Sequence, residues 1–355
     1  MKRYRKTLVV AAFVLCTILL SCIERGITGS LSTQTLADRW SQEEAFAQIA
    51  CYFTEDAYFT TDQIISVERS LVTAMEEASI SSTKENGGRN WIDAYSTQGE
   101  MMISSSRASL SVRAFGVGGD FFQFHPLTLL DGNYFDSTDA NEDGVIIDEV
   151  VAWQLFGSSH VAGMEVEING AIYPVRGVVR SDEGLFSEEV DEAAATIYVS
   201  YGILEGEDGS LPIDCYEVLL ANPVKGFGKE TVGTALGMGE ESYELIECSA
   251  RYDFLNRLNV IRSIGIRSMT TKNIVFPYWE NRARGYEDIS ALFLVLEIIC
   301  LIYPVVVLIQ KLYQLWKKRK AFKQIIKEKC SQLWGFAFPL LKNTIKTYRT
   351  VNKKK

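Results

Sequence analysis

Two long apolar runs lie near the two ends of the chain. The second run, Ile289 to Ile309, has 21 residues and a single charge, Glu297. As a helix rising ~1.5 Å per residue it would be roughly 31 Å long, which matches the ~30 Å hydrocarbon core of a bilayer. The first run, Leu8 to Ile23, has 16 residues and follows a basic start. The two runs therefore predict two membrane helices.

The first run allows three interpretations. It is an uncleaved anchor, the apolar part of a signal peptide, or a lipoprotein signal, because Leu19-Leu20-Ser21-Cys22 resembles a lipoprotein cleavage box with an unusual Leu at its second position. No small-x-small cleavage site follows, and this favours the uncleaved anchor. Each interpretation places the region between the two runs outside the cytoplasm.

Helical and strand patterns alternate irregularly after the first run. Ser41-Gln42-Glu43-Glu44 has the form of a capping box, and the apolar residues of segment 46–53 recur at helical spacing, which predicts a helix. A second helix is predicted from Asp62, and a loop over Ser81–Asn90. Short alternating runs from Trp91 to Ala114 predict strands. The apolar residues that define the two helices are Phe46, Ile49, Ala50 and Phe53 in the first, and Ile64, Val67, Leu71, Met75 and Ala78 in the second.

The clearest local pattern lies between residues 145 and 179. Val145-Ile146-Ile147 predicts a buried strand, Asp148 a helix cap, and Gly157 the end of that helix. Residues 164–168 alternate between apolar side chains and glutamates, which predicts a strand with one exposed face. Asn169-Gly170 then predicts a tight hairpin turn, because both residues tolerate a positive φ.

Further strands are predicted at Thr196–Tyr201, Cys215–Ala221 and Tyr243–Cys248, with a helix around Lys229–Leu236 between the last two. The mixture predicts an α+β fold, an extracytoplasmic mixed α/β domain held between two transmembrane helices. The predicted parts are a cytoplasmic stub and anchor at 1–28, the extracytoplasmic domain at 29–288, a transmembrane helix at 289–310 and a basic cytoplasmic tail at 311–355.

Charge is segregated along the chain in the same way. The whole chain carries −9, but residues 1–6 carry +4 and residues 311–355 carry +13, which leaves −26 for residues 7–310. Lys and Arg collect on the cytoplasmic side of membrane helices, so both termini are expected in the cytoplasm. An acidic domain also argues against nucleic acid as a partner.

Two motifs suggest ligand binding but lack required residues. Asp139–Gly144 matches the opening of an EF-hand calcium loop, yet position 12 is Val150 and Glu149 stands one place early, so an acidic surface turn is the better interpretation. Gly116-Val117-Gly118-Gly119 lacks the spacing of a phosphate-binding loop, and no Gly-x-x-x-x-Gly-Lys-Ser/Thr occurs. The chain is therefore not its own ATPase.

Histidine and cysteine usage gives no catalytic constellation. His125 and His160 are the two histidines, far apart in sequence, and no nucleophile elbow accompanies them. We therefore predict no catalytic residue, no metal ligand and no cofactor, and the protein is not expected to be an enzyme. Among the extracytoplasmic cysteines a Cys215–Cys248 disulfide can be drawn, but buried thiols are the favoured interpretation, with Cys51 as the third.

Two membrane-proximal features suggest partners. Glu297 lies near the middle of the second apolar run, where an ionisable group either faces protein or is tolerated as a neutral acid. The basic tail, with aromatic residues such as Trp334 and Phe336, can lie on the inner lipid leaflet or contact a cytoplasmic protein.

A segment between residues 121 and 179 resembles a known family. The chain resembles the MacB-like periplasmic core domain of ABC-transporter permeases, specifically over about 121–180 and more loosely over about 30–290. The residues that carry the resemblance are Phe121-Phe122, Leu129-Leu130-Asp131-Gly132-Asn133-Tyr134-Phe135, Val145–Glu149, Ala152-Trp153-Gln154-Leu155-Phe156-Gly157, Gly163 and Val175-Arg176-Gly177-Val178-Val179.

The resemblance implies a function and partners. It implies a permease-type subunit or accessory of an ABC transporter, coupled to a separate ATPase subunit and to a further permease subunit or a second copy. Family members usually continue into a third and fourth membrane helix, whereas the later apolar stretch here, Leu333–Leu341, is interrupted by Pro339 and too short to span. The alternative is a stand-alone membrane-anchored binding or sensor domain. The sequence names no substrate.

Overall fold

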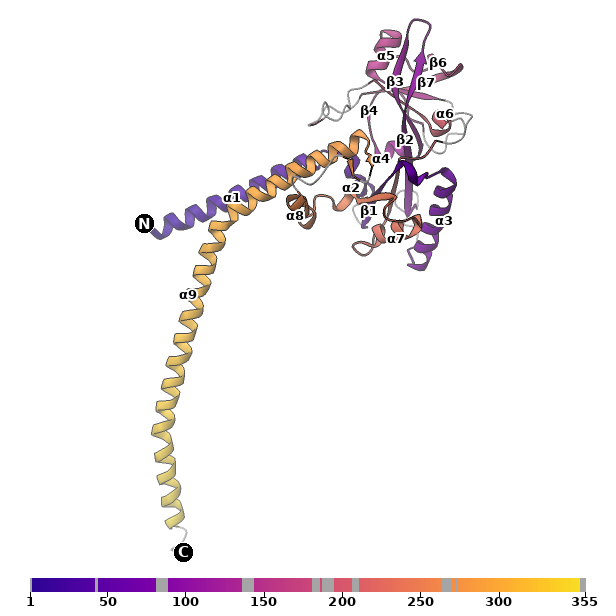
Figure 1. The fold of residues 1–355 in the computed structure, drawn as a ribbon. Helices are drawn as coiled ribbons and strands as arrows, with labels where there is room; N and C mark the ends of the chain where they lie inside the picture. The colour runs from indigo at the N-terminus through magenta and orange to yellow at the C-terminus, as the bar shows by residue number, and fades with distance from the viewer. Residues whose placement is uncertain are drawn as a thin grey trace. The chain divides into compact units, whose positions relative to one another are not determined.

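The computed structural model describes residues 2–41, 44–80, 89–135, 144–180, 186, 195–205, 211–263, 270–271 and 273–351, without the side chains of 2–3, 270–271, 321–322, 324–326 and 330–351. Most of the predicted loop at Ser81–Asn90 and of the acidic turn at Asp139–Gly144 lies outside these residues. The chain forms two compact units, one of Ile23–Leu294 and one of Met1–Cys22 with Val295–Lys355 (Figure 1).

The elements follow one another as helices and strands without strict alternation. The helices are α1 (Lys2–Thr28), α2 (Leu36–Trp40), α3 (Thr61–Glu77), α4 (Phe121–Phe124), α5 (Glu149–Phe156), α6 (Tyr201–Glu205), α7 (Phe227–Leu236), α8 (Phe254–Ser263) and α9 (Tyr278–Val351), with 3-10 turns η1 (Ser32–Gln34), η2 (Glu55–Ala57) and η4 (Cys248–Ala250). The strands are β1 (Phe46–Phe53), β2 (Trp91–Ser104), β3 (Ser109–Gly119), β4 (Thr128–Gly132), β5 (Val145–Asp148), β6 (Glu165–Ile168), β7 (Ala171–Arg180), β8 (Thr196–Ser200), β9 (Cys215–Ala221), β10 (Tyr243–Glu247), β11 (Thr270–Thr271) and β12 (Ile274–Val275).

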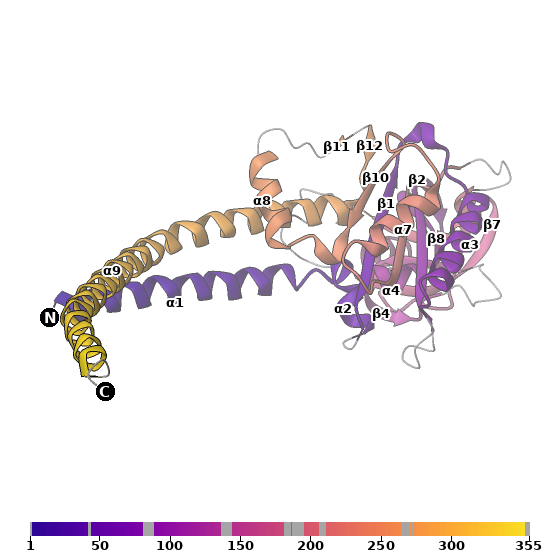
Figure 2. The same ribbon diagram turned by 90° about the horizontal axis from the view of Figure 1, so that it is seen from below.

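One mixed sheet organises the larger unit. Its strand order is β10-β1-β9-β2-β3-β8-β5-β7-β4, and β6 pairs with both β2 and β7. Antiparallel pairs predominate, while β3 pairs β8 and β5 pairs β7 in parallel. Strands β9 and β10 both run antiparallel to β1, which lies between them, so β9, α7 and β10 form a split β-α-β unit. The α+β prediction is therefore confirmed. Figure 2 shows α3 and α7 together against this half of the sheet.

The helix predicted over Phe46–Phe53 is wrong, because this segment is strand β1. All eight of its residues are buried, and it lies between β9 and β10 with covered surfaces on both faces of the sheet. A strand buried on both faces has no polar side to alternate with its apolar side. Its apolar residues can therefore match a helical spacing by chance.

The patterns predicted around α3 and α5 are confirmed. The buried residues of α3 are Ile64, Val67, Leu71 and Met75, on the predicted face. The Oδ1 atom of Asp148 accepts a hydrogen bond of 2.7 Å from the backbone N–H of Val151 and caps α5. The turn between β6 and β7 has Asn169 at φ 52° and Gly170 at φ 81°, as its sequence requires.

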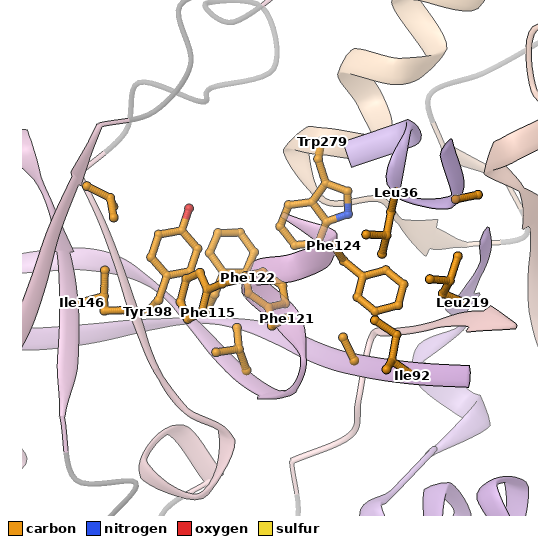
Figure 3. Close-up of a cluster of buried hydrophobic side chains, with 14 of the residues drawn as sticks. Leu36, Ile92, Phe115, Phe121, Phe122, Phe124, Ile146, Tyr198, Leu219 and Trp279 are labelled. Carbon is orange, nitrogen blue, oxygen red and sulfur yellow. The ribbon is translucent and has the colours of Figure 1, made fainter. Parts of the chain in front are cut away.

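An aromatic cluster fills the centre of the larger unit (Figure 3). The ring of Phe115 from β3 stacks on Tyr198 from β8 at a centroid distance of 5.6 Å. Trp279, in the first turn of α9, lies 5.2 Å from the ring of Phe115 and 5.9 Å from that of Phe121. The start of α9 is therefore part of the domain core. We expect such aromatic pairs to add about 0.5–1.5 kcal/mol each beyond their apolar burial.

The segment that resembles the permease family holds β4 against β7. Gly132 has φ 73°, and a Cβ there would lie 2.1 Å from the carbonyl oxygen of Arg176. The carboxylate of Asp131 accepts a hydrogen bond of 3.0 Å from the N–H of Ala162. The motif is thus explained by backbone packing, which only glycine permits at position 132.

In the smaller unit, α1 packs against α9 around residues 300–303. The rings of Phe13 and Tyr303 are 5.7 Å apart, and the sulfur atoms of Cys16 and Cys300 are 3.9 Å apart. Glu297 is only 9% exposed, so it faces protein within its own chain. Among the described residues, Tyr4–Thr28 and Tyr278–Lys320 contain helices long and apolar enough to cross a membrane. This agrees with the two predicted membrane helices.

Gly132 and Gly170, which both have a positive φ, give a matched test of the packing argument made for β4 and β7. We expect Gly170→Ala to lower stability by about 1–2 kcal/mol, the cost of a left-handed L-residue. Gly132→Ala should lower it considerably more, because its Cβ meets backbone while that of residue 170 has no atom within 4 Å. The measurement is thermal melting of the full chain in mild detergent. Equal melting temperatures for the two variants would refute the packing argument.

Candidate functional site

The ends of α1 and α9 that belong to the larger unit meet the sheet at a buried network of charged and polar side chains. We name this network the coupling cluster. Its members come from η1, β1, β10, the residue after η4, and the first three turns of α9. They are Gln34, Tyr52, Glu244, Arg251, Glu280, Arg284 and Glu287.

Glu280 is the centre of the coupling cluster. Its side chain has no exposed surface. One oxygen, Oε1, accepts hydrogen bonds from the guanidinium of Arg251 and from Nε of Arg284, the latter at 2.9 Å. The other oxygen, Oε2, accepts a hydrogen bond of 3.2 Å from the hydroxyl of Tyr52 on β1. Both carboxylate oxygens are therefore satisfied without water.

Arg251 joins three separate segments of the chain. Besides Glu280, its guanidinium donates to Oε1 of Gln34 at 2.8 Å and to Oε1 of Glu287 at 2.7 Å. Burial by itself lowers the pKa of Arg251, but Glu280 and Glu287 outweigh burial and raise the pKa well above its usual value. Burial, followed by the charge of Glu280, likewise raises the pKa of Tyr52. The arginine is therefore held charged and the tyrosine neutral.

Arg284 extends the coupling cluster to the edge strand of the sheet. It donates a hydrogen bond of 3.0 Å to Oε1 of Glu244 on β10. The guanidinium carbon lies 3.7 Å from the ring centroid of Phe276, a stacking contact that favours Arg over Lys. One turn of α9 is thus bonded to β1 and β10 together.

A second buried group joins α1, α8 and α9. Ser290 of α9 has no exposed surface, and its hydroxyl donates to Oε1 of Glu24 on α1. Arg257 of α8 donates to the carbonyl oxygen of Ser290 through Nε and Nη2, at 3.2 and 3.0 Å. Nε of Arg257 also lies 3.8 Å from Oε1 of Glu24. The two helix ends are therefore bonded to each other as well as to the domain.

The energetics of such groups favour a fixed geometry. A buried ion pair contributes little relative to apolar packing, but removing one partner leaves an uncompensated buried charge and costs about 3–5 kcal/mol. The coupling cluster therefore resists separation of α9 from the sheet. Its role is to hold α9 against the sheet, because both carboxylate oxygens of Glu280 already accept hydrogen bonds.

The sequence did not reveal the coupling cluster. Glu280, Arg284 and Glu287 stand three and four residues apart just before the second apolar run, a spacing that signals one charged helix face. Arg251 and Gln34 carry no comparable signal, because they are distant in sequence from the residues that they bind.

The sequence-predicted candidates lie elsewhere. Glu149, next to the acidic turn, forms a salt bridge with Arg180 at 2.8 Å. His160 is mostly exposed, whereas His125 is buried and contacts Glu217 through Nε2, a pair that sequence analysis missed. Among the described residues, no cluster of three or more His, Cys, Asp or Glu side chains has metal-binding geometry.

The glycines and cysteines have structural surroundings. Gly116–Gly119 belongs to β3, inside the sheet. Cys51, Cys215 and Cys248 are buried free thiols, and burial raises the pKa of each. The favoured interpretation of Cys215 and Cys248 as buried thiols agrees with this arrangement.

A cleft of about 630 Å³ opens on the face of the sheet next to the coupling cluster. Glu100 and Arg113 face each other across β2 and β3 on its wall. Asp214 accepts hydrogen bonds from the hydroxyl of Thr97 at 3.0 Å and from the N–H of Gln98 at 2.9 Å, and burial raises its pKa. The cleft is thus polar, with charged groups on β2 and β3 and on the residue before β9.

The larger unit is a mixed α/β domain, and the sequence around it contains two helices of membrane-spanning length and composition. The family model of the MacB-like periplasmic core domain matches residues 7–223. The chain belongs to this family, and the resemblance stated from residues 121–180 is confirmed. No curated protein matches the chain.

Several solved structures are similar to this chain. The extracellular domain of the noncanonic ABC-type transporter YknZ from Gram-positive bacteria is 17% identical, with a TM-score of 0.38, over 56% of this chain and 100% of that one. The periplasmic region of MacB from Actinobacillus actinomycetemcomitans is 14% identical, with a TM-score of 0.40, over 62% and 94%. A domain of a putative permease protein from Porphyromonas gingivalis is 11% identical, with a TM-score of 0.33, over 59% and 92%.

Replacing the central carboxylate tests the coupling cluster. We expect Glu280→Gln to lower the stability of the full chain in mild detergent by about 3 kcal/mol, because Arg251 and Arg284 lose their shared counter-charge. This corresponds to a melting temperature roughly 6–12 °C lower.

The matched control is Asp253→Asn, which breaks an exposed salt bridge of 2.6 Å with Lys225. That change should cost less than about 1 kcal/mol. Similar decreases in melting temperature for the two variants would show that the buried coupling cluster contributes no more to stability than an exposed salt bridge.

Proposed function

We propose that the protein is a permease-type subunit or accessory of an ABC transporter, with an extracytoplasmic domain coupled through two membrane helices to a separate ATPase. Membership of the MacB-like family supports the class. The observation that carries the proposal is the coupling cluster. Tyr52, Glu280 and Arg251 bind the sheet to the start of α9 through side chains that are almost fully buried.

The proposed function requires that movement of α9 be transmitted to the extracytoplasmic domain. A helix end that moves under the action of an ATPase moves the domain only if the joint does not yield. A joint of buried ion pairs yields at a cost of several kcal/mol, whereas a flexible linker yields freely. The joint at Glu280 therefore suits a domain that is displaced as one body.

The proposed arrangement of the chain follows the charge pattern. Residues 1–28 would form the cytoplasmic stub and anchor, 29–288 the extracytoplasmic domain, 289–310 the second membrane helix and 311–355 a cytoplasmic tail. The tail carries +13, which suits the anionic inner leaflet or an acidic surface of the ATPase subunit. A further permease subunit or a second copy is the proposed partner of this pair of helices within the membrane.

Topology is tested by the access of a membrane-impermeant maleimide to single added cysteines. Val224 is 69% exposed in the domain, so Val224→Cys should be labelled in intact cells. Lys318→Cys, in the basic segment after the second apolar run, should be labelled only after permeabilisation. The parent chain gives the background from its own cysteines. Labelling of Lys318→Cys in intact cells would refute a cytoplasmic tail.

The transporter proposal is tested with the tagged full chain purified in mild detergent. We expect an ABC ATPase subunit to co-purify in fixed ratio, and the purified assembly to hydrolyse ATP. Glu280→Gln should retain the ATPase subunit but change ATP turnover severalfold, since it loosens the joint rather than the cytoplasmic contact. Asp253→Asn should leave turnover unchanged.

A stand-alone binding or sensor domain is the second candidate function, and the cleft of about 630 Å³ favours it. Clefts of this size with a few convergent polar groups are typical of ligand sites. Purification of the chain without any ATPase subunit, together with saturable ligand binding that is lost in Arg113→Ala, would select this function over the first.

A further inference from the structure

Helix α8 presents two large apolar side chains to solvent. Phe254 is 59% exposed and Leu255 is 65% exposed. At 100° per residue these two residues share an arc of about 120° with Leu258 and Ile261, while Asn256 and Asn259 fall on another side. Leu258 and Ile261 are partly buried, whereas Phe254 and Leu255 in the first turn of the helix are left uncovered by the domain.

The position of α8 along α9 is fixed by hydrogen bonds. Arg257 lies on a side of α8 next to the apolar arc, and its guanidinium binds the carbonyl oxygen of Ser290 at 3.0 and 3.2 Å. Ser290 is the second residue of the apolar run that begins at Ile289, and Leu292 two residues later is 61% exposed. The apolar side of α8 therefore lies at the level where α9 enters its apolar run.

The charge of α8 differs from that of the domain that carries it. Segment 254–263 contains Arg257 and Arg262 and no acidic residue, whereas residues 7–310 together carry −26. Arg262, in the last turn, is exposed. At 100° per residue Arg262 falls within the apolar arc, at the far end of the helix from Phe254 and Leu255. A long arginine side chain at the end of an apolar stripe places its guanidinium among phosphates while the stripe lies among acyl chains.

We propose that α8 lies in the outer surface of the membrane, with Phe254 and Leu255 inserted at the boundary between headgroups and acyl chains. The helix thereby sets the height and tilt of the domain above the bilayer. Lipid is the occupant favoured by the structure, because the exposed side chains of Phe254 and Leu255 lie near the level at which the apolar run of α9 begins, and the exposed Arg262 complements anionic headgroups. The proposal requires only that α9 spans the membrane, and it is independent of an ATPase partner.

The test uses the full chain in vesicles of phosphatidylcholine and phosphatidylglycerol. Cys16, Cys22, Cys300 and Cys330 are replaced by serine, while the remaining three cysteines are buried and unreactive. An environment-sensitive fluorophore is then attached at Phe254→Cys or Leu255→Cys. The controls are Asn256→Cys on the polar side of α8 and Ile172→Cys, which is 66% exposed and lies in the distant β6–β7 hairpin.

We expect blue-shifted emission at positions 254 and 255, and severalfold stronger quenching there by lipids with a nitroxide near the headgroup than at positions 256 and 172. Equal quenching at all four positions would overturn the proposal. Blue-shifted emission at 254 and 255 without quenching by lipid would also overturn it, because a second copy or another subunit would then cover the helix. All four positions are exposed, so these variants are expected to fold.

Discussion

Burial of the Glu280 carboxylate is the constraint on which the arrangement of the helix ends depends. The carboxylate is enclosed among Arg251, Arg284 and Tyr52, which come from a loop, from its own helix and from the sheet. A buried charge tolerates no loss of a partner, so these groups fix one another. The direction in which α9 leaves the sheet follows from this set of bonds.

Apolar packing and charge act together at this joint. Trp279 fills the aromatic core between Phe115 and Phe121, while the next residue, Glu280, faces the arginines. Adjacent residues on a helix point in directions about 100° apart, so a single turn of α9 supplies an apolar anchor and an ionic one. Displacing α9 would expose the tryptophan and separate the charges at the same time.

The residues that identify the family differ from those that form the joint. Gly132 packs β4 closely against β7 and Asp131 accepts a hydrogen bond from Ala162, at the opposite end of the strand order from β10 and β1. The family match ends at residue 223, before Arg251 and Glu280. Membership thus defines the domain, whereas the coupling cluster is a feature that the structure of this chain supplies. The match includes Gln34 and Tyr52 of the coupling cluster but not its charged members, so the role proposed for the joint rests on burial and bonding.

The sequence by itself determined what depends on neighbours along the chain. The spacing of Ile64 to Met75 gave helix α3, Asn169-Gly170 gave a turn, and the apolar runs gave the membrane helices, because periodicity and φ preferences act over a few residues. The tertiary structure decided the rest. It made Phe46–Phe53 a strand by covering both of its faces, and it brought Arg251 to Glu280. Pairing between distant charges is set by the folded chain, and no local pattern encodes it.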